Sequence, residues 1–212
     1  MTQFPFPNAC TKSTAPLQLV HSDVWGPTPI TSINGTRYYV SFIDDFSKFT
    51  WFFPLKHKSQ VLSTFMHFKS TIETLLNHKL KVIRIDCGGE YTDIAFQQYC
   101  STNGIFHQFT CPNTPQRNGG VERNHWHIFE IALSLISQSS LPLSYWPYAF
   151  ATSIFLINRV PTATLNFHFH GKFSLVHLQI ILPLKNLDVL VFLFSHPITN
   201  INWSLNLRSV FS

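Results

Sequence analysis

Residues 37–55, with the sequence RYYVSFIDDFSKFTWFFPL, decide the fold that we expect. Residues 37–43 are rich in β-branched and aromatic side chains, and this run stops at Asp44 and Asp45. Residues 49–55 form a second run of the same kind, and Pro54 marks its end. Two such runs joined by a short polar segment predict a β-hairpin.

The segments around this hairpin alternate between strand and helix patterns. Residues 17–24 predict a strand before it, and residues 59–78 predict a helix after it, because their apolar side chains recur at spacings of three and four. Further strands are expected over residues 81–86 and 105–109, helices over residues 93–103, 121–137 and 145–158, and a loop rich in Pro, Asn and Gly over residues 111–120. This alternation predicts an α/β domain.

Composition excludes several classes of protein. Of the 212 residues, 45% are hydrophobic, which excludes disorder as a description of the whole chain. Four cysteines without a CxxC pair exclude a disulfide scaffold, and we expect no zinc site. We see no targeting signal and expect the nucleus or cytoplasm, with no membrane partner. The net charge of +5 is compatible with nucleic acid as a partner.

Three carboxylates stand at the ends of predicted elements. Asp23 and Asp86 each end a strand, and Glu122 lies in the first turn of a helix. Each alone is typical of a turn, a helix cap or a residue that complements the helix dipole. Three carboxylates that converge would repel one another and would need cations. Hard oxygen ligands suit Mg²⁺ or Mn²⁺, and two such ions are typical of phosphoryl transfer.

Five motifs carry a family resemblance. They are LVHSDVWGP (residues 19–27), IDDFSKFTWFFPLKHKS (43–59), RIDCGGEYT (84–92), CPNTPQRNGGVERNHWHI (111–128) and YWPYAFATSIFLINRVPT (145–162). Together they resemble the integrase core of copia-type LTR retrotransposons over about residues 1–166. Thirty-five residues separate Asp86 from Glu122, as in the Asp, Asp-35-Glu triad of retroviral-type integrases.

The resemblance implies a fold, a site and a reaction. The fold would be RNase H-like, with a five-stranded mixed sheet flanked by helices. Asp23, Asp86 and Glu122 would be catalytic and would hold two Mg²⁺ or Mn²⁺ ions for 3′-end processing and strand transfer of DNA. The partners would be element ends, target DNA and further copies of the chain.

Basic and polar residues around Glu122 are the expected DNA contacts. Arg117 and Arg123 flank Glu122, and Asn118 and His127 belong to the same motif. His125 and His127 cannot form a metal pair, because positions two apart on a helix face different ways. We therefore expect both histidines at the surface or against phosphate.

Three departures from the family pattern leave the activity open. Cys87 stands where the family has Asn, Asn124 where it has Lys, and Trp126 near an expected base. Losing two cations weakens DNA binding. Three readings therefore stand: an active integrase core, a nucleic-acid-binding remnant without turnover, and another RNase H-like nuclease.

The chain divides into three expected parts. Residues 1–16 are a leader, residues 17–166 the integrase core, and residues 167–212 an irregular tail that loses the resemblance. The tail is apolar, but Lys185 and Asp188 lie in the window that could otherwise span a membrane. We interpret it as a frameshifted translation.

Overall fold

The computed structural model describes residues 13–85, 88–109 and 115–159, and over residues 115–124 it describes the backbone alone. The expected domain boundary near residue 166 and the expected tail lie outside these ranges. Within them, no helix is long and apolar enough to cross a membrane.

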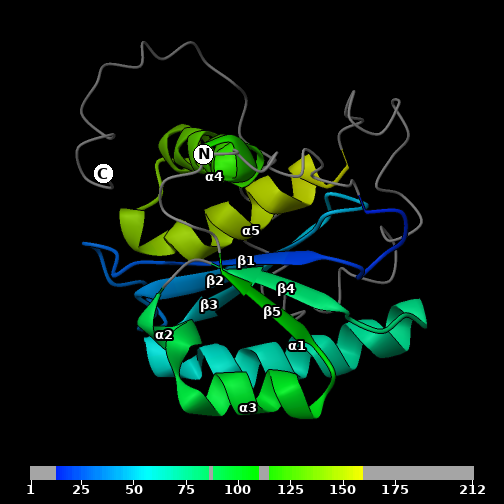
Figure 1. The fold of residues 1–212 in the computed structure, drawn as a ribbon. Helices are drawn as coiled ribbons and strands as arrows, with labels where there is room; N and C mark the ends of the chain where they lie inside the picture. The colour runs from blue at the N-terminus through cyan, green and yellow to red at the C-terminus, as the bar shows by residue number, and fades with distance from the viewer. Residues whose placement is uncertain (1–12, 86–87, 110–114, 160–212) are drawn as a thin grey trace, which may run out of the picture.

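The centre of the fold is one mixed sheet of five strands (Figure 1). The strands are β1 (Val20–Trp25), β2 (Tyr38–Asp44), β3 (Thr50–Leu55), β4 (Val82–Ile85) and β5 (Phe106–Phe109). Their order is β3-β2-β1-β4-β5, with β1, β2 and β3 antiparallel and with β4 parallel to both β1 and β5. The predicted hairpin is confirmed as β2 and β3, and the predicted mixed sheet is confirmed as a whole.

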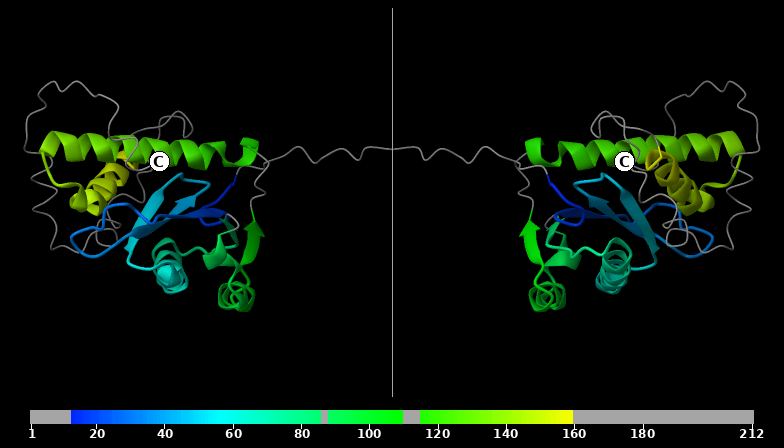
Figure 2. Two further views of the ribbon diagram at one scale, coloured as in Figure 1. Left: turned by 90° about the vertical axis from the view of Figure 1, so that its left-hand side faces the viewer. Right: turned by 90° about the vertical axis from the view of Figure 1, so that its right-hand side faces the viewer.

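Helices cover the two faces of this sheet as separate layers (Figures 1 and 2). On one face lie the 3₁₀ turn η1 (Lys58–Gln60), α1 (Val61–Leu76), α2 (Gly89–Thr92) and α3 (Ile94–Thr102). On the other lie α4 (Pro115–Ser139), the 3₁₀ turn η2 (Leu143–Tyr145) and α5 (Trp146–Ile157). Because side chains alternate along a strand, β1 contributes to both layers.

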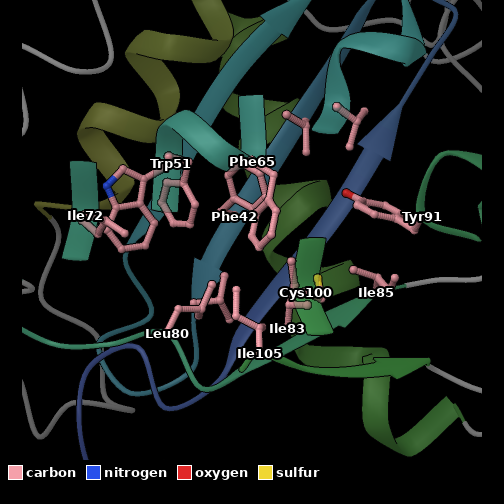
Figure 3. Close-up of a cluster of buried hydrophobic side chains, with 14 of the residues drawn as sticks. Phe42, Trp51, Phe65, Ile72, Leu80, Ile83, Ile85, Tyr91, Cys100 and Ile105 are labelled. Carbon is pink, nitrogen blue, oxygen red and sulfur yellow. The ribbon is translucent and has the colours of Figure 1, made fainter. Parts of the chain in front are cut away.

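The layer of α1 and α3 contains the larger hydrophobic core (Figure 3). Phe42 of β2 stacks on Phe68 of α1 with ring centroids 4.3 Å apart and planes 9° apart. Phe65 stacks in turn on Phe96 of α3 at 5.1 Å. Such pairs add about 0.5–1.5 kcal/mol beyond the burial of their area. This stack fixes α1 and α3 to the sheet.

The layer of α4 and α5 contains a second core, which includes the candidate site's neighbours. Tyr39 and Phe52 come from the sheet, Phe129 from α4, and Trp146 and Phe150 from α5. Trp146 is fully buried, and its indole N–H donates to the carbonyl of Ile30 at 3.2 Å. The two helices therefore pack on the sheet through aromatic side chains.

Helix α4 begins earlier than the sequence predicts. The expected helix start at Val121 and the expected loop are corrected over residues 115–120, because α4 starts at Pro115, whereas residues 111–114 of that loop lie outside the described residues. Proline is favourable in the first turn of a helix, where its missing N–H has no intrahelical partner. Gly119 and Gly120 each cost about 1 kcal/mol there. The packing of Ile128, Phe129 and Ala132 against the sheet and α5 offsets that cost.

Two further elements differ from the expectation. Pro54 lies inside β3 rather than at its end, which an edge strand tolerates because no neighbour needs the missing N–H. The short helix α2 was not predicted, since its four residues are too few to show a period. Tyr91 of α2 is fully buried, and its hydroxyl shares a hydrogen bond with Ser22 of β1.

Asn158 joins the end of α5 to the start of β3. Its side chain accepts from the backbone N–H of Thr50 at 3.0 Å and donates to the carbonyl of Thr50 at 2.8 Å. The residue is 2% exposed. The amide therefore pairs with the strand as a neighbouring strand would.

We expect Asn158→Ala to destabilise the protein by about 3 kcal/mol, because two buried hydrogen bonds are lost. Urea unfolding followed by circular dichroism measures the change. Asn103→Ala is the matched control, since the side chain of Asn103 also makes two hydrogen bonds, with Tyr99 and Lys69, but is exposed. A loss for Asn158→Ala no larger than that of the control would contradict the assignment.

Candidate active site on the central strand

Asp23 lies in the middle of β1, the central strand of the sheet. It is paired in register with Ser41 of β2 and is half-buried. Val20 and Val24 of β1 pack in the core beneath α1, whereas Trp25 packs in the core beneath α4 and α5. Alternation along the strand therefore directs Asp23 to the α4 side.

An aromatic wall stands beside Asp23 on this face. Trp25 and Tyr39 are paired across β1 and β2, and their ring centroids are 5.4 Å apart. Tyr39 is 3% exposed and also contacts Phe52 at 5.1 Å and Phe150 at 5.4 Å. Burial, and then the negative charge of Asp23, raises the pKa of the Tyr39 hydroxyl well above its ordinary value. The negative charge of Asp23 therefore acts on the hydroxyl of a tyrosine that is buried among aromatic rings.

His125 brings α4 to this wall. The Tyr39 hydroxyl lies 3.0 Å from His125 Nδ1, and the two rings are stacked with centroids 5.9 Å apart. Burial lowers the pKa of His125, so the imidazole is neutral at pH 7. A neutral Nδ1 can accept the hydroxyl proton of Tyr39. His125 is half-buried and its ring packs against Tyr39, so the expectation of a surface position is corrected, whereas contact with phosphate stays a prediction.

The structure describes the three predicted acids to different extents. Asp23 is described in full. Asp86 lies outside the described residues, and it follows Ile85, the last residue of β4, which is paired with Ser22. Glu122 lies in α4, three residues before His125, and only its backbone is described. Among described residues no group of three metal-ligating side chains occurs, and only one of the three predicted ligands has a described side chain. Asp23 supplies the anionic oxygen that a hard cation prefers.

The predicted DNA contacts all fall on α4. Arg117, Asn118 and Arg123 belong to the part of the helix described by its backbone alone. His127 is exposed, in agreement with the expectation for it. Trp126 is 56% exposed and touches Phe129 edge-on at 6.0 Å. This part of α4 therefore presents an aromatic side chain near the position where the resemblance expects a base.

His21 lies on the same face of β1 as Asp23, but its side chain contacts Asp45 rather than the candidate site. It is 7% exposed, and its Nε2 lies 3.4 Å from Asp45 Oδ1. Lys48 Nζ donates to the same oxygen at 2.6 Å, and the hydroxyl of Ser13 donates to Oδ2 at 2.8 Å. His21 thus belongs to a polar cluster that ties the chain before β1 to the β2–β3 turn.

Sequence reasoning missed the contact between Tyr39 and His125. They are 86 residues apart in the chain, so no local period links them. One signal was available: His125 follows Glu122 by three residues, a spacing that puts two helix positions on the same side.

Comparison with known proteins fits this geometry. The family described as integrase core domain matches residues 13–115. The chain is 46% identical over 161 residues to the retrovirus-related Pol polyprotein from transposon RE2 of Arabidopsis thaliana, which covers 76% of the chain and 11% of that relative. The corresponding polyprotein from transposon TNT 1-94 of Nicotiana tabacum is 46% identical over 151 residues, covering 71% and 11%.

The chain thus spans about a tenth of the length of these curated relatives, which are Pol polyproteins of copia-type transposons. The predicted resemblance to copia-type retrotransposons is confirmed.

Solved structures confirm the predicted fold. The simian T-cell lymphotropic virus intasome, in complex with PP2A regulatory subunit B56 gamma, matches with a TM-score of 0.60 and 19% identity, over 77% of this chain and 56% of that one. The HTLV-2 integrase catalytic core domain in complex with magnesium, in a trimeric form, matches with a TM-score of 0.55 and 19% identity, over 76% and 98%. The fold is RNase H-like.

The contacts of Asp45 predict how the stability of the protein depends on pH. Hydrogen bonding by His21 lowers the pKa of Asp45 most, burial opposes this, and Lys48 and Ser13 lower it further. A depressed folded pKa stabilises the protein above the unfolded pKa of about 3.9, and that stabilisation is lost as pH falls below it. We expect Asp45→Asn to cost about 1–2 kcal/mol at pH 7 and clearly less at pH 3.

Urea unfolding at both pH values measures this difference. Asp93→Asn is the control, because Asp93 caps α3 in an exposed position where Asn also caps well. A cost for Asp45→Asn that does not change between pH 7 and pH 3 would contradict the assigned ion pairs.

Proposed function

We propose that this chain is the catalytic core of a DNA integrase, which trims the 3′ ends of an element's DNA and joins them to target DNA. Asp23, Asp86 and Glu122 are the proposed acidic triad, with two Mg²⁺ or Mn²⁺ ions as cofactor. The observation that carries the proposal is the pairing of β1 with β4. Ile85 lies opposite Ser22, so the residues next in sequence to this pair are Asp23 and Asp86.

The contact between α4 and the sheet supports Glu122 as the third acid of the proposed triad. His125 is bound to Tyr39, and the charge of Asp23 reaches Tyr39. Glu122 lies less than one helical turn before His125. Helix α4 therefore crosses the same face of β1 to which Asp23 points.

Each proposed step is a displacement at phosphorus. Water in the trimming step, or a DNA 3′-hydroxyl in the joining step, forms a new P–O bond, and a 3′-oxygen leaves and takes up a proton. When bound, divalent ions activate the attacking oxygen and stabilise the leaving one. The chain supplies anionic oxygen at Asp23 and a water-poor wall at Trp25 and Tyr39. No side chain attacks phosphorus, so no covalent intermediate with the protein forms.

A second function is favoured by one observation. Trp126 is 56% exposed where the resemblance expects a base nearby, which supports a nucleic-acid-binding remnant without turnover. The HTLV-2 neighbour is in complex with magnesium, which supports a divalent ion as the proposed cofactor. DNA and further copies of the chain are the partners proposed with either function. The compartment, nucleus or cytoplasm, stays a prediction.

We expect Asp23→Asn, Asp86→Asn and Glu122→Gln each to reduce strand transfer on a short duplex to below about 1% of wild type, because each removes a charge that would hold a cation. The assay uses Mn²⁺ and a labelled duplex, with melting temperature as a check on folding. Glu130→Gln, eight residues further along α4 at an exposed position, is the control for Glu122. Full activity in any triad variant would remove that residue from the triad.

The same assay separates the alternatives. Duplex binding without turnover in the wild-type chain would support the remnant. Cleavage of RNA in an RNA–DNA hybrid, without strand transfer, would support another RNase H-like nuclease.

The exposed surface of α4 gives a further prediction. Asn124→Lys combined with Trp126→Arg adds two cations, and each new phosphate contact should steepen the plot of log K against log salt by roughly 0.9. We therefore expect a change of at most about 1.8, independent of sequence. Binding of a duplex across a salt series measures it.

The control adds the same charge elsewhere. Met66→Lys with Leu75→Lys does so at two exposed positions of α1, on the opposite face of the sheet. Equal slopes for the two double variants would show that α4 does not face DNA.

A further inference from the structure

One polar contact joins α4 to the sheet inside the aromatic wall. The Tyr39 hydroxyl lies 3.0 Å from His125 Nδ1 and 3.3 Å from His125 Nε2, and the contact is partly buried. The two rings are also stacked, with planes 17° apart. His125 further contacts the Trp25 ring, with centroids 6.3 Å apart. The contact therefore combines a polar contact at the edge of the imidazole with the packing of stacked rings.

The Tyr39 end of this contact is fixed by its surroundings. Its ring is 3% exposed and is enclosed by Trp25, Phe52, Trp146 and Phe150 at centroid distances between 5.1 and 6.3 Å. These rings hold the phenol, and so its hydroxyl oxygen, in one position. His125 contacts that oxygen from α4, so the pair is one of the contacts that fix α4 relative to the sheet.

The chemistry of the pair suits a permanent contact. Burial favours the neutral forms of both groups, so the phenol donates and the imidazole accepts. A hydrogen bond in a low-dielectric site is electrostatically stronger than one in water. Nothing in the pair has to change its protonation at neutral pH for the contact to persist.

The contact joins α4, which carries Glu122, to β2, the antiparallel neighbour of the strand that carries Asp23. Tyr39 is paired with Trp25, and the next pair on the same face of the sheet is Ser41 with Asp23. His125 is three residues after Glu122 in one continuous helix. Any shift of His125 relative to Tyr39 therefore moves the backbone of Glu122 relative to Asp23.

We propose that Tyr39 and His125 are positioning residues that set the separation of α4 from the sheet beside β1, and so the affinity of the site proposed at Asp23 and Glu122 for a divalent cation. The proposal rests on the proposed function, since it concerns the same site. Neither residue needs to touch the cation. They act by holding the ligand-bearing helix at one distance from the ligand-bearing strand.

The test measures Mn²⁺ binding by the full chain, through the electron paramagnetic resonance signal of free Mn²⁺. Tyr39→Phe removes the hydroxyl and keeps the ring, and His125→Phe removes the acceptor and keeps a stackable ring. We expect each to raise the Mn²⁺ dissociation constant roughly three- to tenfold, the scale of one lost hydrogen bond. The double variant should be no weaker than the weaker single variant, because both remove one contact.

Tyr38→Phe is the matched control. Tyr38 is the adjacent residue of β2 and packs against the core on the opposite face. It should bind Mn²⁺ as the wild type does. Melting temperatures are measured for all variants, and if His125→Phe does not fold, Tyr39→Phe alone decides.

The outcomes separate this proposal from the proposed function. Mn²⁺ binding that depends on Asp23 but is unchanged in Tyr39→Phe and His125→Phe would overturn the positioning role and leave the triad standing. A lower melting temperature with unchanged Mn²⁺ affinity would do the same, because it shows a purely structural contact. Mn²⁺ binding that is unaffected by Asp23→Asn, or absent from the wild type, would overturn both proposals.

Discussion

The position of β1 between an antiparallel and a parallel neighbour is the constraint on which the candidate site depends. β2 pairs with it along its whole length, whereas β4 pairs with its first half and ends at Ile85. Each side chain of β1 must therefore fit one of two different helical layers. Ser22 turns toward Tyr91 of α2, and Asp23, one residue later, turns toward α4. A shift of one residue in this register would exchange the two and bury the acid in the aromatic core beneath α1.

Much of this arrangement can be predicted from the sequence, because it follows from local periods. The hairpin of β2 and β3 and the helix α1 are visible in patterns of two and of three to four residues. The start of α4 is not, since Asn118, Gly119 and Gly120 locally favour a loop. Packing of the later turns of the helix overrides that preference. The intrinsic helix propensity of a residue has little influence on where a helix begins when tertiary packing is strong.

The polar contacts of the candidate site are less predictable still. Tyr39 and His125 meet across 86 residues, and His21 and Asp45 across 24. Side chains of the same type can satisfy buried groups, bind ligands or face water, and only the fold selects among these. His125 and His127 illustrate this: they are two residues apart in α4, yet one is packed against Tyr39 and the other is exposed. This difference in burial follows from helical geometry once the position of α4 on the sheet is known, because residues two apart on a helix face different ways.

The electrostatics of Asp23 connect the fold to the proposed chemistry. Its charge is felt at Tyr39, a ring that is 3% exposed, so water does not screen it on that side. In the proposed function, Asp86 and Glu122 would add further negative charge near Asp23, and carboxylates that converge repel one another. Divalent cations would offset this repulsion, which the aromatic side chains cannot do. The proposed site would then divide two tasks: the aromatic core holds β1 and α4 in place, and bound cations would balance the charge of the acids.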